Sequence, residues 1–218
     1  MATVVTAITI GISVIALLTS LITAWLTFFM KGTLKMTQPT IISFGQDGRF
    51  EDGNPPSKKI CIRTLLFSTS RRGQMIESMY INIQRAETKQ NFSMWGYDEG
   101  KLVRGSGLFV GPNGTALYHH FLLPPDGSTF YFISGDYILR VYAKLVETNK
   151  QLELANIPLR ISESDAKQLE SLDAMLVFDW GPDKQNYYSR IDKRPNRIFL
   201  EELLALANQE RSPKKNKD

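Results

Sequence analysis

The stretch YILRVYAKLV, residues 137–146, decides the fold class, because apolar and polar side chains alternate along it. Its apolar residues share one face of an extended chain: Leu139, Val141, Ala143 and Leu145. The opposite face carries Arg140, Tyr142 and Lys144. A period of two residues is typical of a β-strand with one face in the core and the other in water. The stretch therefore predicts a half-buried strand within an antiparallel sheet.

Segments on both sides of this strand repeat the pattern. Met79–Gln84 alternates in the same way, and Ile60–Phe67 is apolar on both faces except at Arg63, which predicts a central strand. Shorter runs predict further strands at Thr40–Phe44, Phe92–Tyr97, Gly107–Val110, Thr115–Leu123, Phe130–Ile133 and Leu152–Ile161. Because proline has no N–H to donate to a ladder, Pro158 marks the last of them as an edge or bulged strand.

The connections between these strands are short and suit tight turns rather than crossover helices. Turn residues are concentrated at Arg71–Gly73, Gly111–Gly114 and Pro125–Gly127. About nine short strands joined in this way predict a mainly β fold with an antiparallel, β-sandwich-like domain, and a closed barrel is the alternative. The paired cysteines of immunoglobulin domains are absent, because Cys61 is the sole cysteine.

The first thirty residues have a different character. No charged side chain occurs from Ala2 to Met30, and Lys31 and Lys35 follow directly. About 20 apolar residues of helix span the hydrocarbon core of a bilayer, so this run predicts one N-terminal transmembrane helix. A cleaved secretory signal, the alternative, is typically shorter and begins with basic side chains. Because basic residues follow the helix and none precedes it, the positive-inside rule places the C-terminal part in the cytoplasm.

Small and hydroxyl side chains recur in this helix at alternating steps of three and four residues, which places them along one stripe. The stripe consists of Ala2, Thr6, Thr9, Ser13, Ala16, Ser20, Thr23 and Thr27. Because small residues let helices approach closely in lipid, we predict a helix–helix interface for self-association or for another membrane protein. The alternative is that each hydroxyl bonds to its own helix backbone and needs no partner.

All charged side chains follow residue 30, and the net charge of the chain is only +4. This mild balance does not indicate nucleic acid as a partner. One soluble domain is expected at this size. The predicted organisation is an anchor at 1–30, a juxtamembrane linker at 31–38, the β-domain at 39–161, a helical or mixed extension packed on it at 162–210, and a basic disordered tail at 211–218.

Helical patterns return only after the sheet. Ser162 or Ser164 is a suitable N-cap for a short helix, and the apolar run Met175–Trp180 predicts one more strand. A final helix is predicted over Arg197–Gln209, because Pro195 opens it and apolar side chains recur along one side. We expect these C-terminal helices to pack on the domain, with binding to a partner protein as the alternative for the last one.

No residue pattern predicts catalysis, a metal site or a bound cofactor. His119 and His120 are the only histidines, and adjacent strand residues point to opposite faces, so the two cannot share one metal ion. Cys61 with either histidine is a conceivable nucleophile, but a small buried strand residue is the expectation. The glycine-rich run Arg104–Gly114 lacks the Lys-Ser/Thr end of a phosphate-binding loop and predicts a hairpin.

Aromatic and basic side chains near the C-terminus predict a surface for a protein partner, because interfaces are enriched in Tyr, Trp and Arg. The predicted site consists of Trp180, Tyr187, Tyr188, Arg190, Arg194 and Arg197. The expected function is therefore a non-enzymatic binding or scaffolding component of a membrane complex. The competing prediction is a membrane-tethered enzyme or carbohydrate-binding module outside the cytoplasm, with a groove formed by Trp95, Tyr97, Asp98 and the histidines.

Overall fold

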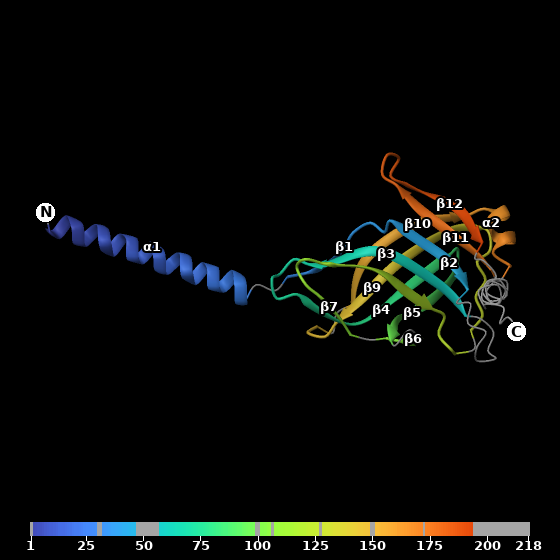
Figure 1. Cartoon of the computed structure of the whole chain (residues 1–218), viewed down its shortest axis with the longest axis horizontal. Coiled ribbons are helices and arrows are strands. Elements are labelled where there is room, and N and C mark those ends of the chain that lie inside the picture. Colours follow the sequence, from blue (N-terminus) through green and yellow to red (C-terminus); the bar gives the residue numbers. More distant parts are fainter. Residues whose placement is uncertain are drawn as a thin grey trace, which may run out of the picture.

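The computed structural model describes residues 2–29, 32–46, 57–98, 101–105, 107–126, 128–148, 151–171 and 173–193. A long helix, α1 (Ala2–Phe28), projects from one end of a β-rich domain that contains the other described elements (Figure 1). The apolar helix and the predominance of antiparallel strands confirm the two main parts of the predicted fold.

α1 lies outside the body of the domain, and none of its residues is buried (Figure 1). Its 27 residues extend over about 40 Å, which exceeds the roughly 30 Å thickness of the hydrocarbon core of a bilayer. By length and composition the helix could cross a membrane, and a signal sequence near the N-terminus would meet the same criteria.

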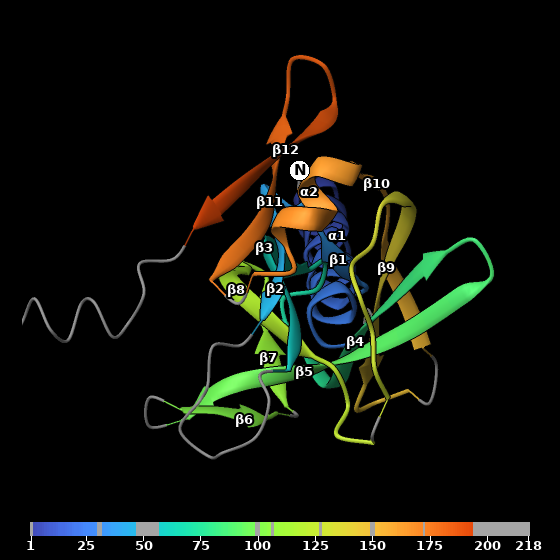
Figure 2. The same cartoon turned by 90° about the vertical axis from the view of Figure 1, so that its right-hand side faces the viewer.

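The β-domain is built on one antiparallel sheet that curls into a half-barrel. Within the described residues its strands are β1 (Leu34–Met36), β2 (Ile41–Gln46), β3 (Lys58–Ser68), β4 (Gln74–Arg85), β5 (Thr88–Asp98), β6 (Lys101–Arg104), β7 (Leu108–Val110), β8 (Thr115–Leu122), β9 (Gly135–Leu145), β10 (Gln151–Ile161), β11 (Ala174–Gly181) and β12 (Asn186–Lys193). The main path is β10-β9-β4-β5-β8-β3-β2-β11-β12, while β1, β6 and β7 pair with β3, β5 and β4, respectively. Figure 2 looks into the domain from the end opposite α1 and shows the strands curving around its interior.

The predicted sandwich is not confirmed. Two separate layers would require a break in strand pairing, whereas all neighbours along the main path are hydrogen-bonded. Alternating side chains suit a sandwich and a half-barrel equally, because each architecture buries one face of every strand. The pairing of β9 with β10 shifts register between Glu153 and Ala155, and that of β4 with β9 shifts between Ile76 and Ser78. Such irregularities bend and twist a sheet, and side-chain alternation does not reveal them.

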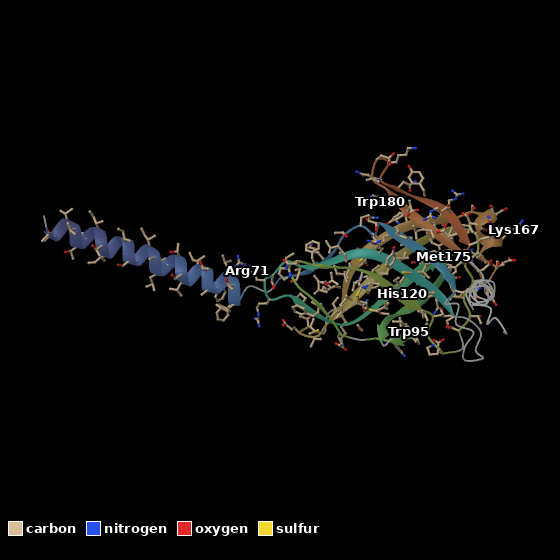
Figure 3. All side chains as sticks on the ribbon, in the orientation of Figure 1. Arg71, Trp95, His120, Lys167, Met175 and Trp180 are labelled. Carbon is tan, nitrogen blue, oxygen red and sulfur yellow. The ribbon has the colours of Figure 1, made fainter. Side chains whose placement is uncertain are left out.

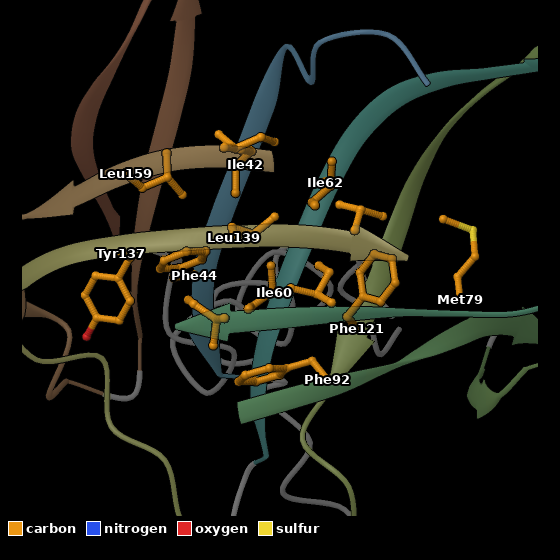
Figure 4. Close-up of a cluster of buried hydrophobic side chains, with 14 of the residues drawn as sticks. Ile42, Phe44, Ile60, Ile62, Met79, Phe92, Phe121, Tyr137, Leu139 and Leu159 are labelled. Atoms are coloured by element: carbon orange, nitrogen blue, oxygen red, sulfur yellow. The ribbon is translucent and has the colours of Figure 1, made fainter. Parts of the chain in front are cut away.

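The inner face of the half-barrel holds the hydrophobic core (Figure 4). Strands from both arms of the curved sheet contribute Ile42, Phe44, Ile60, Ile62, Met79, Phe92, Phe121, Tyr137, Leu139 and Leu159. The Phe44 ring stacks on Phe132, with ring centres 4.8 Å apart, and meets Phe178 edge-on at 5.3 Å. The core thus joins strands that are distant in the sheet, and it holds the curled sheet together.

Residues 130–133 form no strand, which corrects the prediction for that segment. Buried and exposed side chains nevertheless alternate along this segment: Phe130 and Phe132 are buried, and Tyr131 and Ile133 are exposed. The two phenylalanine rings contact each other and Phe92, so the segment fills the interior without joining the sheet. An extended chain that packs only through its side chains has the same period as a paired strand.

Several other predictions are confirmed. β3 lies between β8 and β2 in the middle of the path, and β10, which contains Pro158, forms one end of it. Met175–Trp180 lies within β11. Ser162 caps the short helix α2 (Glu163–Gln168), because its side chain accepts a hydrogen bond from the Asp165 N–H.

The C-terminal region contains a strand that the sequence did not predict. β12 was not predicted as a strand, because most of its residues are exposed on both faces and its sequence does not alternate clearly. The predicted helix over Arg197–Gln209 and the predicted tail at 211–218 lie outside the described residues, so both stay predictions.

Candidate partner-binding site on the β11–β12 hairpin

The hairpin of β11 and β12 forms one end of the sheet. β11 lies between β2 and β12, with Leu176–Asp179 paired to Ile41–Phe44 of β2. β11 pairs with β12 over its whole length, and β12 has no second neighbour among the described strands. The tip of the hairpin stands out from the body of the domain (Figure 1). One strand edge of the hairpin is therefore available for contact within the described part of the chain.

One face of the hairpin is fixed to the domain by Trp180 and Tyr187. The two residues are opposite each other in the register, with ring centres 5.0 Å apart. The Tyr187 hydroxyl donates to the Pro39 carbonyl oxygen at 2.7 Å and accepts from Gln38 Nε2 at 2.9 Å. Burial raises the pKa of Tyr187 to about 12, so its hydroxyl stays protonated and able to donate at neutral pH. These two aromatic residues hold the hairpin against the β1–β2 connection.

The other face presents Tyr188 to solvent. Its side chain is 45% exposed, and its ring lies against Gly181, where an added Cβ atom would come within 2.2 Å of it. Lys184 Nζ lies 5.9 Å from the centre of the Tyr188 ring, within reach of a cation–π contact. The ring is thus held in place at the hairpin tip while much of its surface remains accessible.

Arg190 lies on the same face as Tyr188, between two carboxylates. Its Nε donates to Asp179 Oδ2 at 2.8 Å, and its Nη1 donates to Asp192 Oδ1 at 2.5 Å. The hydrogen bond that Arg190 donates to Asp179 raises the pKa of Arg190 above its usual range. These groups are solvent-exposed, so the pairs stabilise the fold by little. Their main effect is to hold the guanidinium group in one orientation on the surface.

The structure brings four of the six predicted partner-binding residues onto this hairpin, but it divides them between two faces. Trp180 and Tyr187 lie on the face toward the domain, whereas Tyr188 and Arg190 are accessible. Trp180 can be found on the projecting hairpin in Figure 3. Arg194 and Arg197 lie outside the described residues. The predicted site did not include Lys184, Asp179 and Asp192, which surround the two accessible side chains. Recognising β12 as the partner strand of β11 would have placed these residues together.

The hydroxyl groups of the predicted helix–helix stripe bond to carbonyl oxygens one turn earlier in α1. The donors are Thr6, Thr9, Ser13, Ser20 and Thr23, at 2.7–2.9 Å. This is the alternative that the sequence left open, and it satisfies these donors without a neighbouring helix. Ala2, Ala16 and Thr27 complete the stripe, so its small side chains still offer a surface for close packing.

The residues of the competing groove are only partly brought together. Trp95 of β5 and His120 of β8 are cross-strand neighbours, and Cys61 of β3 lies opposite His120 on its other side. The side chains of Tyr97 and Asp98 lie outside the described residues. A hollow of about 360 Å³ does occur between α2 and residues 131–134, but none of the predicted site residues lines it.

His119 faces the core and not the surface that Trp95 and His120 share. It is opposite the buried Ile62, its side chain is 3% exposed, and burial lowers its pKa to about 4. The two histidines thus lie on opposite faces, as predicted. Within the part of the chain that the structure describes, no group of three or more His, Cys, Asp and Glu residues could hold a metal ion.

Comparison of the sequence with protein-family models gives no match, and a search of curated proteins gives none either. The candidate site is therefore interpreted from its own chemistry.

Proposed function

We propose that this chain is a single-pass membrane protein whose β-domain acts, without catalysis, as a binding or scaffolding component of a membrane complex. The observation that carries the proposal is an unburied apolar helix of membrane-spanning length joined to a folded domain with a projecting aromatic and basic hairpin. The bilayer is the proposed partner of α1, and another protein is the proposed partner of the hairpin.

The bilayer matches the surface of α1. Large apolar side chains such as Ile8, Leu18 and Phe28 are more than half exposed on the helix. Each gains about 1.5–3 kcal/mol when it leaves water, so the helix is strongly driven into lipid. Lys31 and Lys35 directly follow it and favour a cytoplasmic β-domain.

Alkaline extraction of membranes tests the anchor. A full-length chain that stays in the membrane pellet supports the proposal. Recovery in the soluble fraction, or a mature chain that begins after Lys31, contradicts it and favours a signal sequence. Protease digestion of sealed vesicles then tests orientation, because a cytoplasmic domain is digested only when the inner face of the membrane is exposed.

The accessible face of the hairpin suits a protein partner. Tyr188 and Arg190 are residue types that often dominate the binding energy of interfaces, and both are held in place before binding, by Gly181 and by Asp179. A side chain that is already ordered loses less conformational entropy when a partner binds.

A double variant, Tyr188→Ala with Arg190→Ala, tests this role in the full-length membrane-inserted chain. We expect at least a tenfold loss of cross-linked partner, equivalent to about 1.4 kcal/mol, with an unchanged melting temperature. The matched control is Tyr131→Ala with Arg160→Ala, which removes an exposed tyrosine and an exposed arginine from other elements. If the two double variants capture equal amounts of cross-linked partner, the hairpin is not the partner-binding site.

Self-association through the stripe of α1 is a further part of the proposal. Because the hydroxyl donors are bonded within the helix, the contribution we expect is close packing rather than interhelical hydrogen bonding. Ser13→Leu with Ser20→Leu should weaken association in a membrane two-hybrid assay. Ala16→Leu should do the same, while Ala7→Leu, nine residues away and on the opposite side of the helix, should not. An unchanged signal in all variants would exclude the stripe as an interface.

A further inference from the structure

The end of α1 is joined directly to the turn between β3 and β4. Arg72 Nη1 donates to the Phe28 carbonyl oxygen at 3.1 Å, at the C-terminal end of the helix, where a cation also interacts favourably with the helix dipole. The Thr33 N–H donates to Thr69 Oγ1 at 2.7 Å, and the Thr69 N–H donates to the Thr33 carbonyl oxygen at 3.0 Å. Figure 3 shows Arg71, the neighbour of Arg72, close to the end of the helix.

The part of the β-domain at this end carries several exposed apolar side chains. We call it the α1-facing rim and define it as residues 69–75, β7 and residues 146–148. Met75 and Phe109 are cross-strand neighbours, and the Val146 N–H donates to the Met75 carbonyl oxygen. The exposed fractions are 43% for Met75, 56% for Phe109 and 59% for Val146. Three large apolar side chains thus form one exposed cluster.

Gly73 allows the turn and the Phe109 ring to approach each other. Its φ is +73°, and a Cβ atom at this position would lie 2.5 Å from Phe109 Cζ. The ring therefore lies over the turn that contains Arg71 and Arg72, both of which are exposed. Lys35 on β1 is also exposed, and Glu147, beside Val146, is an acidic side chain of the same rim. Basic groups outnumber acidic groups among these residues.

We propose that the α1-facing rim rests on the lipid headgroups of the membrane that holds α1, with its apolar cluster in the interface and Arg71 and Arg72 on anionic lipid. The inference rests on the proposed membrane anchoring of α1. The short connection between α1 and the domain favours the lipid surface as the binding partner of the rim. Five residues, 29–33, separate α1 from β1, so the domain begins within about 20 Å of the helix end. The bond from Arg72 to Phe28 brings the rim closer still.

The last turn of α1 fits this position. Trp25 and Phe29 stack with ring centres 5.2 Å apart, and aromatic side chains of this kind concentrate at the level of the headgroups. Arg72 is hydrogen-bonded to the same turn, so its guanidinium group lies at that depth as well. Apolar side chains combined with arginine are the surface that binds an anionic membrane interface.

The test uses the full-length chain in nanodiscs of phosphatidylcholine, with or without phosphatidylserine, in a Cys61→Ala background. A Val146→Cys variant carries an environment-sensitive fluorophore, and a Tyr131→Cys variant carries the same fluorophore on an exposed residue next to the Lys58 end of β3, away from the rim. We expect lipid-borne quenchers to reach the label at position 146 but not the label at position 131. Arg71→Gln with Arg72→Gln should at least halve that quenching in phosphatidylserine discs, whereas Arg160→Gln should leave it unchanged.

Three failures are distinguishable. If the chain stays in the membrane after alkaline extraction but the label at position 146 is not quenched in either lipid, the rim does not contact the headgroups and the inference is overturned. If the chain is removed by alkaline extraction, the proposed anchor itself fails. Quenching at position 146 that does not depend on phosphatidylserine or on the two arginines would overturn the assignment of anionic lipid.

Discussion

The Tyr187 hydroxyl donates to the Pro39 carbonyl oxygen at 2.7 Å, across 148 positions of the sequence. This bond joins the last hairpin of the sheet to the connection between its first two strands. Pro39 is buried, and Tyr187 also accepts from Gln38 Nε2, so one phenol oxygen links three residues. The hairpin that carries the candidate partner site is therefore positioned by its ladder with β2 and also by a side chain of its other face.

Tyr187→Phe should destabilise the domain by about 1–2 kcal/mol, because it leaves the Pro39 carbonyl oxygen without this donor. Tyr188→Phe is the matched control and should change stability by less than about 0.5 kcal/mol, since Tyr188 is exposed. Urea unfolding of the two variants provides the comparison. Equal stability of both variants would show that the bond does not hold the hairpin.

Stability should fall as the pH drops from neutral, because of His119. Its pKa is about 4 in the folded chain against 6.5 for the free group, so between these values only the unfolded chain binds the proton. Stability present above pH 6.5 is therefore lost as the pH approaches 4, by about 3 kcal/mol in total.

His119→Phe should remove this part of the pH dependence, and His120→Asn should keep it because His119 is retained. Urea unfolding measured at several pH values between 4 and 7 tests the prediction. If the free energy of unfolding of His119→Phe changes with pH as steeply as that of the native chain, the prediction is wrong.

Gly73→Ala should destabilise the domain by about 1–3 kcal/mol, because φ is +73° and the new Cβ would lie 2.5 Å from Phe109 Cζ. Gly111→Ala is the matched control, since its Cβ would meet only Phe109 Cε1, at an ordinary 3.7 Å. In thermal melting experiments, Gly73→Ala should lower the melting temperature and Gly111→Ala should not. A similar loss at Gly111 would point to the glycine content of the turns rather than to this close approach.

Phe132→Ala should cost about 3–5 kcal/mol, although the residue lies in no strand, because its ring stacks on Phe44 and Phe92 in the core. Tyr131→Ala, at the adjacent position, should cost less than about 1 kcal/mol, since Tyr131 is exposed and its ring lies beside Lys58. Chemical denaturation separates the two outcomes. A small cost at Phe132 would mean that segment 130–133 does not stabilise the half-barrel.

The sequence predicted strands by period and could not predict their partners. Tyr137–Val146 and Ile60–Phe67 show their buried faces through alternation, and β9 and β3 are confirmed there. Segment 130–133 has the same period without a ladder, because the period records which side chains are buried and not which backbone groups are paired. Conversely, β12 is paired along its length but mostly exposed, so its sequence does not show the alternation of apolar and polar residues that predicts a strand.

The sequence by itself determined the apolar helix, the antiparallel β class, the edge position of Pro158 and the opposite faces of His119 and His120. These depend on composition and on neighbours along the chain, which the sequence displays directly. Only the tertiary structure decided that the sheet curls into a half-barrel, that β12 pairs with β11 and so divides Tyr187 and Tyr188 between two faces, and that Arg72 meets Phe28. Those features depend on register shifts and on contacts between residues tens to more than a hundred positions apart, and local periodicity contains no information about them.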